Sequence, residues 1–251
     1  MEANGQKIIP YNYLIGRTYA SLFDSNLKSF GVTIVSLPPN PNIDERLKYH
    51  ADLSVFSLGR RYLYLAPHLE HQSEFIATLH ALQIPYSIIK NLQDISYPQD
   101  VQLNIALVGS YAILNPKTVA PAILDSLKSN YDVIAVNQGY TACSICTVDE
   151  RSIITADVGI AKACTSAGLE VLTISPGYIG LSGFEYGFIG GSAIRLPGNI
   201  LAFSGKLDKH PDKDRIFEFL KAKNVQPIYL TDKDIFDFGG AVVVIDQQEN
   251  S

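Results

Sequence analysis

The sequence predicts an α/β protein of five modules, each a strand, a strand, a helix and a strand, that close into a propeller-like ring. Three observations predict this fold class. A helix end, a turn and a buried strand recur five times, two short apolar runs across a tight turn precede four of the helices, and the last strand has no helix after it. Repeats of this size cannot bury their apolar faces alone, so they must pack on one another.

The five helix-to-strand segments are the clearest repeat. In "KACTSAGLEVLTISPG" at residues 162–177, a helix ends, Gly168 occupies the position of a C-cap, and an apolar strand follows. The other four segments are "NLKSFGVTIVSLPP", "TLHALQIPYSIIKN", "SLKSNYDVIAVNQG" and "FLKAKNVQPIYLTD". The predicted strands begin 38 to 56 residues apart, near Val32, Tyr86, Val133, Val171 and Pro227.

The segments that precede four of the helices predict β-hairpins. Each contains two short apolar runs with Gly, Asp or Asn in or beside the turn between them. These segments are "DLSVFSLGRRYLYLAP", "LNIALVGSYAILNP", "CSICTVDERSIITA" and "SAIRLPGNILAFSG". Together with the helix-to-strand segments, they define the four-element module.

The two ends of the chain predict closure of the ring. Residues 11–35 have a helix and a final strand but little room for a hairpin, whereas "FGGAVVVID" at 238–246 is a strand without a helix. Pairing the two ends would hide both sheet edges. We therefore expect a single pentamodular domain over residues 1–251, closed by the C-terminal strand 238–246.

An open, doubly wound α/β sheet is the alternative architecture, because it also alternates strands and helices. Its phosphate loop needs glycines between a strand and the following helix. In this sequence the pairs Gly190-Gly191 and Gly239-Gly240 precede strands instead. The positions of the glycines therefore favour the closed ring.

Composition excludes several classes of protein. Twenty basic and 25 acidic residues give a formal charge of -5, which lacks the footprint of nucleic-acid binding. No apolar run approaches the roughly 20 residues of a membrane span, and the first residues do not resemble a targeting segment, so we expect a cytoplasmic protein. Three cysteines argue against a disulfide framework, and "CSIC" lacks a second ligand pair for zinc. We expect no metal and no cofactor.

Two short stretches carry candidate chemistry. "HADLSVF" places His50, Asp52 and Phe56 at the mouth of a predicted strand, and Cys143 and Cys146 follow His50 by 93 and 96 residues, close to two modules. Five such modules resemble the pentein fold of guanidino-group-modifying enzymes, which include arginine and agmatine deiminases, amidinotransferases and dimethylarginine dimethylaminohydrolase. In the deiminases a His-x-Asp pair opens a strand in the same way, and the nucleophilic cysteine lies two modules downstream.

The resemblance implies a chemical role for each of these side chains. Attack on an amidino carbon needs a thiolate, which a neighbouring cation favours. A histidine then protonates the departing amine and activates water, and a carboxylate holds the N–H fork of the guanidinium. We therefore expect Cys143 as the nucleophile, His50 as the acid and base, and Asp52 as the guanidinium anchor.

Cys143 is preferred over Cys146 because it is expected to begin its strand, as the nucleophile of the family does. Alternation along a regular strand directs residues 143 and 146 to opposite faces, unless a bulge intervenes. Free cysteine also packs like a small apolar residue, so a core role for either thiol stays open. Cys164 lies in a predicted helix and is expected in the core.

The sequence also departs from the family. The module after the nucleophile should supply further carboxylates, but "YGFIGGSAIR" has Gly190 and Gly191 there. These glycines either let a ligand approach the backbone closely or form a turn before a strand. Asp157, Glu185 and Asp237 are the candidate replacements for the missing carboxylates. The module order looks permuted, and "GGAVVVID" carries Val244 where agmatine deiminase has cysteine.

The function expected from these residues is hydrolysis of a small guanidino or amidino compound through a cysteine thiouronium intermediate. The segments "YGFIGG" and "CSIC" are similar to those of uncharacterised bacterial proteins of the guanidino-modifying-like class. The alternative is a non-catalytic protein of the same fold that binds a protein partner, as the ribosomal anti-association factor of this fold does. A reactive thiol near His50 would distinguish the two functions.

Overall fold

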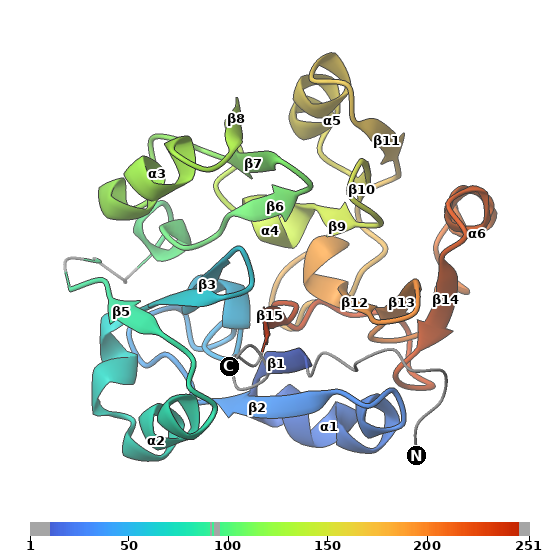
Figure 1. Ribbon diagram of the computed structural model, residues 1–251. Coiled ribbons are helices and arrows are strands. Elements are labelled where there is room, and N and C mark those ends of the chain that lie inside the picture. Colours follow the sequence, from blue (N-terminus) through green and yellow to red (C-terminus); the bar gives the residue numbers. More distant parts are fainter. Residues whose placement is uncertain (1–10, 91, 93–95, 246–251) are drawn as a thin grey trace, which may run out of the picture.

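The computed structural model describes residues 11–90, 92 and 96–245, and it contains five three-stranded sheets arranged around a central axis (Figure 1). In each sheet the first strand runs antiparallel to the second, and the second runs parallel to the third. The sheets are not closed into a barrel. This architecture confirms the predicted five-module α/β propeller.

The strands, given sheet by sheet, are β15 (Val242–Ile245), β1 (Tyr11–Gly16) and β2 (Thr33–Leu37); β3 (Val55–Leu58), β4 (Tyr62–Leu65) and β5 (Tyr86–Ile88); β6 (Ala106–Val108), β7 (Tyr111–Leu114) and β8 (Asp132–Ala135); β9 (Cys146–Thr147), β10 (Ser152–Thr155) and β11 (Glu170–Thr173); β12 (Ala193–Leu196), β13 (Ile200–Phe203) and β14 (Gln226–Tyr229). Every hairpin expected from the sequence is present within these sheets.

One helix in each module lies at the outside of the ring (Figure 1): α1 (Arg17–Lys28), α2 (Ser73–Ala81), α3 (Pro121–Lys128), α5 (Val158–Ser166) and α6 (Lys213–Ala222). Shorter helical turns connect the elements: η1 (Ala51–Leu53), η2 (Pro67–His71), η3 (Gln99–Val101), α4 (Thr141–Ser144) and η4 (Gly190–Ser192). Among the helices in the described ranges, none has the length and apolar character required to cross a membrane.

The apolar cores lie between neighbouring modules. Leu14 and Val244 of the first sheet pack with Leu63 of the second sheet. At the other side of the first sheet, Phe23 packs with Leu196 of the fifth module. Equivalent buried clusters join the second module to the third, the third to the fourth, and the fourth to the fifth. Each module therefore buries its faces against its neighbours, as repeats of this size must.

Strands from the two ends of the described chain pair with each other. In the antiparallel ladder between β15 and β1, Ile245 lies opposite Tyr11 and Val242 opposite Leu14. The strand expected at 238–246 is shorter because Gly239 and Gly240 have φ of 77° and 60°, which a strand does not accommodate. Residue 246 lies outside the described residues. The pairing brings the segment before β15 next to the segment before β3.

Truncating the side chain of Val244 tests how much the pairing of β15 with β1 contributes to the stability of the fold. Val244 is fully buried between the first and second sheets, so Val244→Ala is expected to lower the free energy of unfolding by about 2 kcal/mol, measured by urea denaturation. Val158→Ala is the matched control, because Val158 is 73% exposed and its truncation should change stability by less than about 0.5 kcal/mol. Equal effects at the two positions would contradict the role given to β15.

Candidate functional site

The candidate site lies where short helical turns precede the first strands of the modules. Asp52 belongs to the turn η1 before β3, His50 directly precedes this turn, and Cys143 belongs to α4 before β9. The expectation that Cys143 begins a strand is therefore wrong, since β9 begins at Cys146. The backbone N–H groups of Ala142 and Cys143 donate to the side-chain Oδ1 of Asn104, at 2.7 and 3.3 Å. These bonds hold the segment as a turn instead of a ladder.

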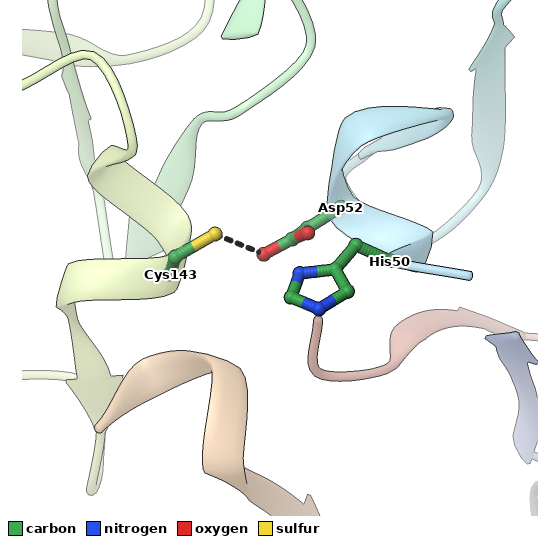
Figure 2. Close-up of side chains that lie close together, drawn as sticks. All are labelled: His50, Asp52 and Cys143. Carbon is green, nitrogen blue, oxygen red and sulfur yellow. Dashed lines mark hydrogen bonds between the residues drawn. The ribbon is translucent and has the colours of Figure 1, made fainter. Parts of the chain in front are cut away.

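Cys143 and Asp52 contact each other directly. The thiol donates a hydrogen bond to Oδ2 of Asp52 at 2.8 Å (Figure 2), which joins the segments before β9 and β3. Both side chains are buried, with 2% of Cys143 and 8% of Asp52 exposed. The other carboxylate oxygen, Oδ1 of Asp52, has no hydrogen-bond partner among the described residues. One acceptor of this carboxylate is therefore available to a ligand.

His50 completes the group that the sequence predicted. Its imidazole lies beside the Asp52 carboxylate in Figure 2, and one ligand atom from each of His50, Asp52 and Cys143 lies within 4.8 Å of the others. Gly239 makes this position possible, because a Cβ there would lie 2.3 Å from the Cα of His50. These residues come from two segments of the chain, and Cys143 follows His50 by 93 positions.

Asp237 lies beside His50. Its Oδ1 is 3.8 Å from Nδ1 of the imidazole, and both residues are buried. The carboxylate accepts hydrogen bonds from the backbone N–H groups of Phe188 and Gly239, each at 2.9 Å. Of the three candidate replacement carboxylates, this is the one beside the cluster. Asp157 caps α5 through Ile160, and Glu185 is exposed.

Asn104 was not singled out by the sequence analysis, although it is fully buried in the site. Its Nδ2 donates to Sγ of Cys143 at 3.2 Å and to the backbone oxygen of Asp52 at 3.3 Å. One side chain thus links the thiol, the turn that carries it and the Asp52 segment. The available signal was positional, because Asn104 precedes β6 as His50, Cys143 and Asp237 precede the first strands of their own modules.

Gly190 and Gly191 approach protein atoms closely. A Cβ on Gly190 would lie 2.3 Å from the backbone oxygen of Ala142, and one on Gly191 would lie 2.1 Å from Oδ1 of Asp237. Both residues form the turn η4 before β12, so the absence of side chains lets η4 pack against α4 and Asp237. Binding of substrate by these glycines stays a prediction.

The side chains of the site are buried without a compensating cation, and this burial shifts their pKa values. Burial raises the pKa of Asp52 to about 7, against the opposing effect of the hydrogen bond from Cys143. Burial and the Asp52 charge raise the pKa of the Cys143 thiol. Burial lowers the pKa of His50, although Asp237 opposes the shift. All three groups are therefore driven toward their neutral forms.

The same three side chains include donor types that zinc accepts, namely an imidazole nitrogen, a carboxylate oxygen and a thiolate sulfur. The group could hold a metal ion, although none was expected from the sequence. A bound metal would occupy the thiol sulfur that nucleophilic attack requires. Metal binding and cysteine catalysis are thus competing uses of this cluster.

A cavity of about 580 Å³ reaches the site along the ring axis, and Asp52, Gly190 and Gly239 line it. Cys146 also lines this cavity, but it packs with Val148 and Ile154 in an apolar cluster. Burial raises the pKa of Cys146 to about 12. Cys164 is fully buried within α5. Unlike Cys143, neither thiol hydrogen-bonds a side chain of the described residues, so both are poor candidates for a nucleophile.

Sequence comparison places the chain in a family. The matching family model is described as "Family of unknown function (DUF6873)", and it covers residues 14–242. The chain belongs to this family. The match to DUF6873 includes His50, Asp52, Asn104, Cys143 and Asp237. A search of curated protein sequences finds no match.

Solved structures share the fold of this DUF6873 member at low sequence identity. Dimethylarginine dimethylaminohydrolase from Pseudomonas aeruginosa, solved with citrulline, has a TM-score of 0.56 at 12% identity over 95% of this chain and 100% of that chain. The inosamine-phosphate amidinotransferase of Streptomyces griseus has a TM-score of 0.57 at 12% identity, covering 92% and 80%. Agmatine deiminase from C. jejuni has a TM-score of 0.54 at 10% identity, covering 88% and 86%. The predicted pentein fold is thereby confirmed.

Replacing Asp52 by asparagine should reveal the cost of burying its charge. Because its pKa is near 3.8 in the unfolded chain and about 7 in the folded protein, the folded state binds more protons between those values. The free energy of unfolding therefore falls as the pH rises through this window. Asp52→Asn stays neutral, so it should be more stable than the wild type at pH 8 by up to about 4 kcal/mol, with a smaller difference at pH 5.

Asp212→Asn is the control of opposite sign. Although burial raises the pKa of Asp212, hydrogen bonds from Ser175 and Arg215 lower it to about 2 overall. This group contributes stability above pH 4, which is lost as the pH falls toward 2. Asp212→Asn should therefore be less stable than the wild type at pH 8. Urea denaturation that finds Asp52→Asn equally or less stable than the wild type at pH 8 would contradict the account of Asp52.

Proposed function

We propose that the protein hydrolyses a small guanidino or amidino compound, with Cys143 as the nucleophile. The observation that supports this proposal most is the contact at 2.8 Å between the Cys143 thiol and the Asp52 carboxylate, with His50 in the same cluster. The residues proposed as nucleophile, proton carrier and anchor for a cation therefore lie together in one buried place. The fold shared with guanidino-group hydrolases and transferases supports the same class of substrate.

A cationic substrate supplies the charge that the empty cluster lacks. A guanidinium next to Asp52 donates to its carboxylate, including the unpartnered Oδ1. The positive charge lowers the pKa of both Asp52 and Cys143, which favours the carboxylate and the thiolate together. Asn104 Nδ2 remains as a donor to the sulfur. The site is thus expected to ionise when a cation binds.

The reaction then proceeds in two displacements. His50 takes the proton of the Cys143 thiol, the thiolate attacks the amidino carbon, and the C–N bond to the leaving amine breaks as His50 gives that proton to the amine. This leaves an S-linked thiouronium. His50, now neutral, takes a proton from water as its oxygen attacks the same carbon, and the C–S bond breaks to return the thiolate. Asp237, 3.8 Å from Nδ1, orients the imidazole and stabilises its charged form.

Ligand positioning in this proposal relies on Asp52 and on the backbone of the glycine turn. Gly190 lines the same cavity as Asp52, so a flat guanidinium between them meets a carboxylate on one side and backbone on the other. Gly191 contributes by packing on Asp237. In this proposal Asp237 is the second carboxylate of the site, and it acts on His50 and not directly on the ligand. The module after the nucleophile supplies no carboxylate to the proposed site.

A non-catalytic binding protein is the second candidate function. The observation that favours it is the burial of the thiol, which is 2% exposed and has a raised pKa. A protein that merely holds a cationic ligand against Asp52 needs neither a thiolate nor a proton carrier. Binding without turnover, unchanged in Cys143→Ser, would favour this function.

Turnover assays with variants separate the two functions. A panel of guanidine, methylguanidines, agmatine and arginine should give ammonia or amine with the wild type and none with Cys143→Ser. Cys146→Ser and Cys164→Ser are matched controls and should keep the activity. His50→Ala should lose turnover and form the Cys143 adduct only slowly, as followed by intact mass, because the leaving amine is no longer protonated and water is no longer activated. Activity that survives in Cys143→Ser would refute the proposed nucleophile.

Asn104→Ala tests the proposed positioning residue in the same assay. Loss of the donor to Sγ should raise the pKa of the thiol, so the pH profile of kcat/KM should shift to higher pH. Asn115→Ala is the matched control, because Asn115 is also buried but bonds the backbone of Asn137, away from the thiol. A loss of activity with an unchanged pH profile would indicate a merely structural role for Asn104.

A further inference from the structure

The axial cavity has a second end that the proposed chemistry does not use. Its inner end is formed by Asp52 and Gly239, and its outer end by the hairpin turns that include Arg60, Gly109 and Asn199. Strand β3 leads from one end to the other, since it begins three residues after Asp52 and ends directly before Gly59. The volume of about 580 Å³ is typical of a small-molecule site.

Arg195 provides an unsatisfied cationic group in this cavity. It lies on β12 and lines the cavity, and its Nη1 is buried without a hydrogen-bond partner among the described residues. A guanidinium stays charged in proteins and offers five N–H donors. A buried donor that lacks a partner costs free energy, so such a group calls for a ligand or an ion. No carboxylate of the described residues forms an ion pair with Arg195.

Arg60 brings a second cation to the same place. It lines the cavity from the turn between β3 and β4, where its backbone oxygen accepts from Ile245 at 2.8 Å. The hydroxyl of Tyr13 donates to the backbone oxygen of Arg195 at 2.9 Å. Burial raises the pKa of Tyr13, while the charges of Arg60 and Arg195 both oppose this shift. Tyr13, Arg60 and Arg195 therefore line one cavity.

The two ends of the cavity differ in charge. The carboxylic side chains that line it are those of Asp52 at the inner end and Glu150 in the exposed turn between β9 and β10. Among the described residues, neither acid forms an ion pair with Arg60 or Arg195. The outer part thus combines two uncompensated arginines with a tyrosine hydroxyl. Planar guanidinium forks match the geometry of carboxylate and phosphate oxygens.

We propose that the outer part of the axial cavity binds a small oxyanion, of the carboxylate or phosphate class, between Arg195 and Arg60. Arg195 donates to the anion through its buried Nη1, and Arg60 closes the site from the hairpin turn. This site lies away from the Asp52 end of the cavity, because Arg195 lies on β12 and Arg60 in the turn between β3 and β4. It goes beyond the proposed hydrolysis, and its occupancy is measured without turnover.

Calorimetric titration at constant ionic strength tests this site, with inorganic phosphate and malonate as probes and chloride as the control anion. The wild type should bind at least one probe saturably, and the preferred probe distinguishes a phosphate site from a carboxylate site. Arg195→Gln should weaken binding by about tenfold or more, which corresponds to loss of a charged hydrogen bond. Arg60→Gln should weaken it less, because Arg60 is exposed.

Controls keep the result independent of folding and of the thiol site. Arg151→Gln removes an exposed arginine from another hairpin turn and should bind as the wild type does. Cys143→Ala should also keep full affinity, even if the proposed hydrolysis fails. Arg195→Lys retains the charge and should fold if Arg195→Gln does not, with weaker binding because the fork is lost. Equal affinity in the wild type and both Arg195 variants, or no saturable binding of either probe, would overturn the proposal.

Discussion

The pairing of β15 with β1 is the constraint on which the remaining structure depends. It joins the two ends of the described chain into one sheet, so each module has a neighbour on both sides and no sheet edge is left open along this seam. The same pairing brings Asp237 to His50, although they are 187 residues apart in the sequence. Ring closure therefore determines both the shared cores and the polar cluster at the axis.

Burial of that cluster affects both the stability of the fold and the ionisation of its side chains. Asp52, Cys143 and His50 occupy a place from which water is largely removed, and within the described residues no arginine or lysine forms an ion pair with them. Each group is therefore held toward its neutral form, and the charged forms become favourable only when a cation enters. Burying these groups without a cation lowers the free energy of unfolding, which is common at functional sites.

The predictable and unpredictable parts of the structure differ in physical origin. Hairpins and helix ends depend on local composition, so alternating apolar runs with Gly, Asp or Asn in their turns were sufficient to predict five modules. His50, Asp52 and Cys143 stood out because their residue types and spacing match a known pattern. The helical turn at Cys143 and the role of Asn104 were missed, because they depend on hydrogen bonds between segments 38 or more residues apart. Residue type alone could not show which of Asp157, Glu185 and Asp237 lies beside the cluster.

The central claim is that Cys143 becomes nucleophilic when a planar cation sits against Asp52. The most direct measurement is the rate of alkylation by chloroacetamidine compared with neutral chloroacetamide, followed by intact mass and peptide mapping. The account predicts much faster labelling by the cationic reagent, confined to Cys143 and reduced to the rate of the neutral reagent in Asp52→Asn. Equal rates for the two reagents in the wild type, or labelling at Cys146, would contradict it.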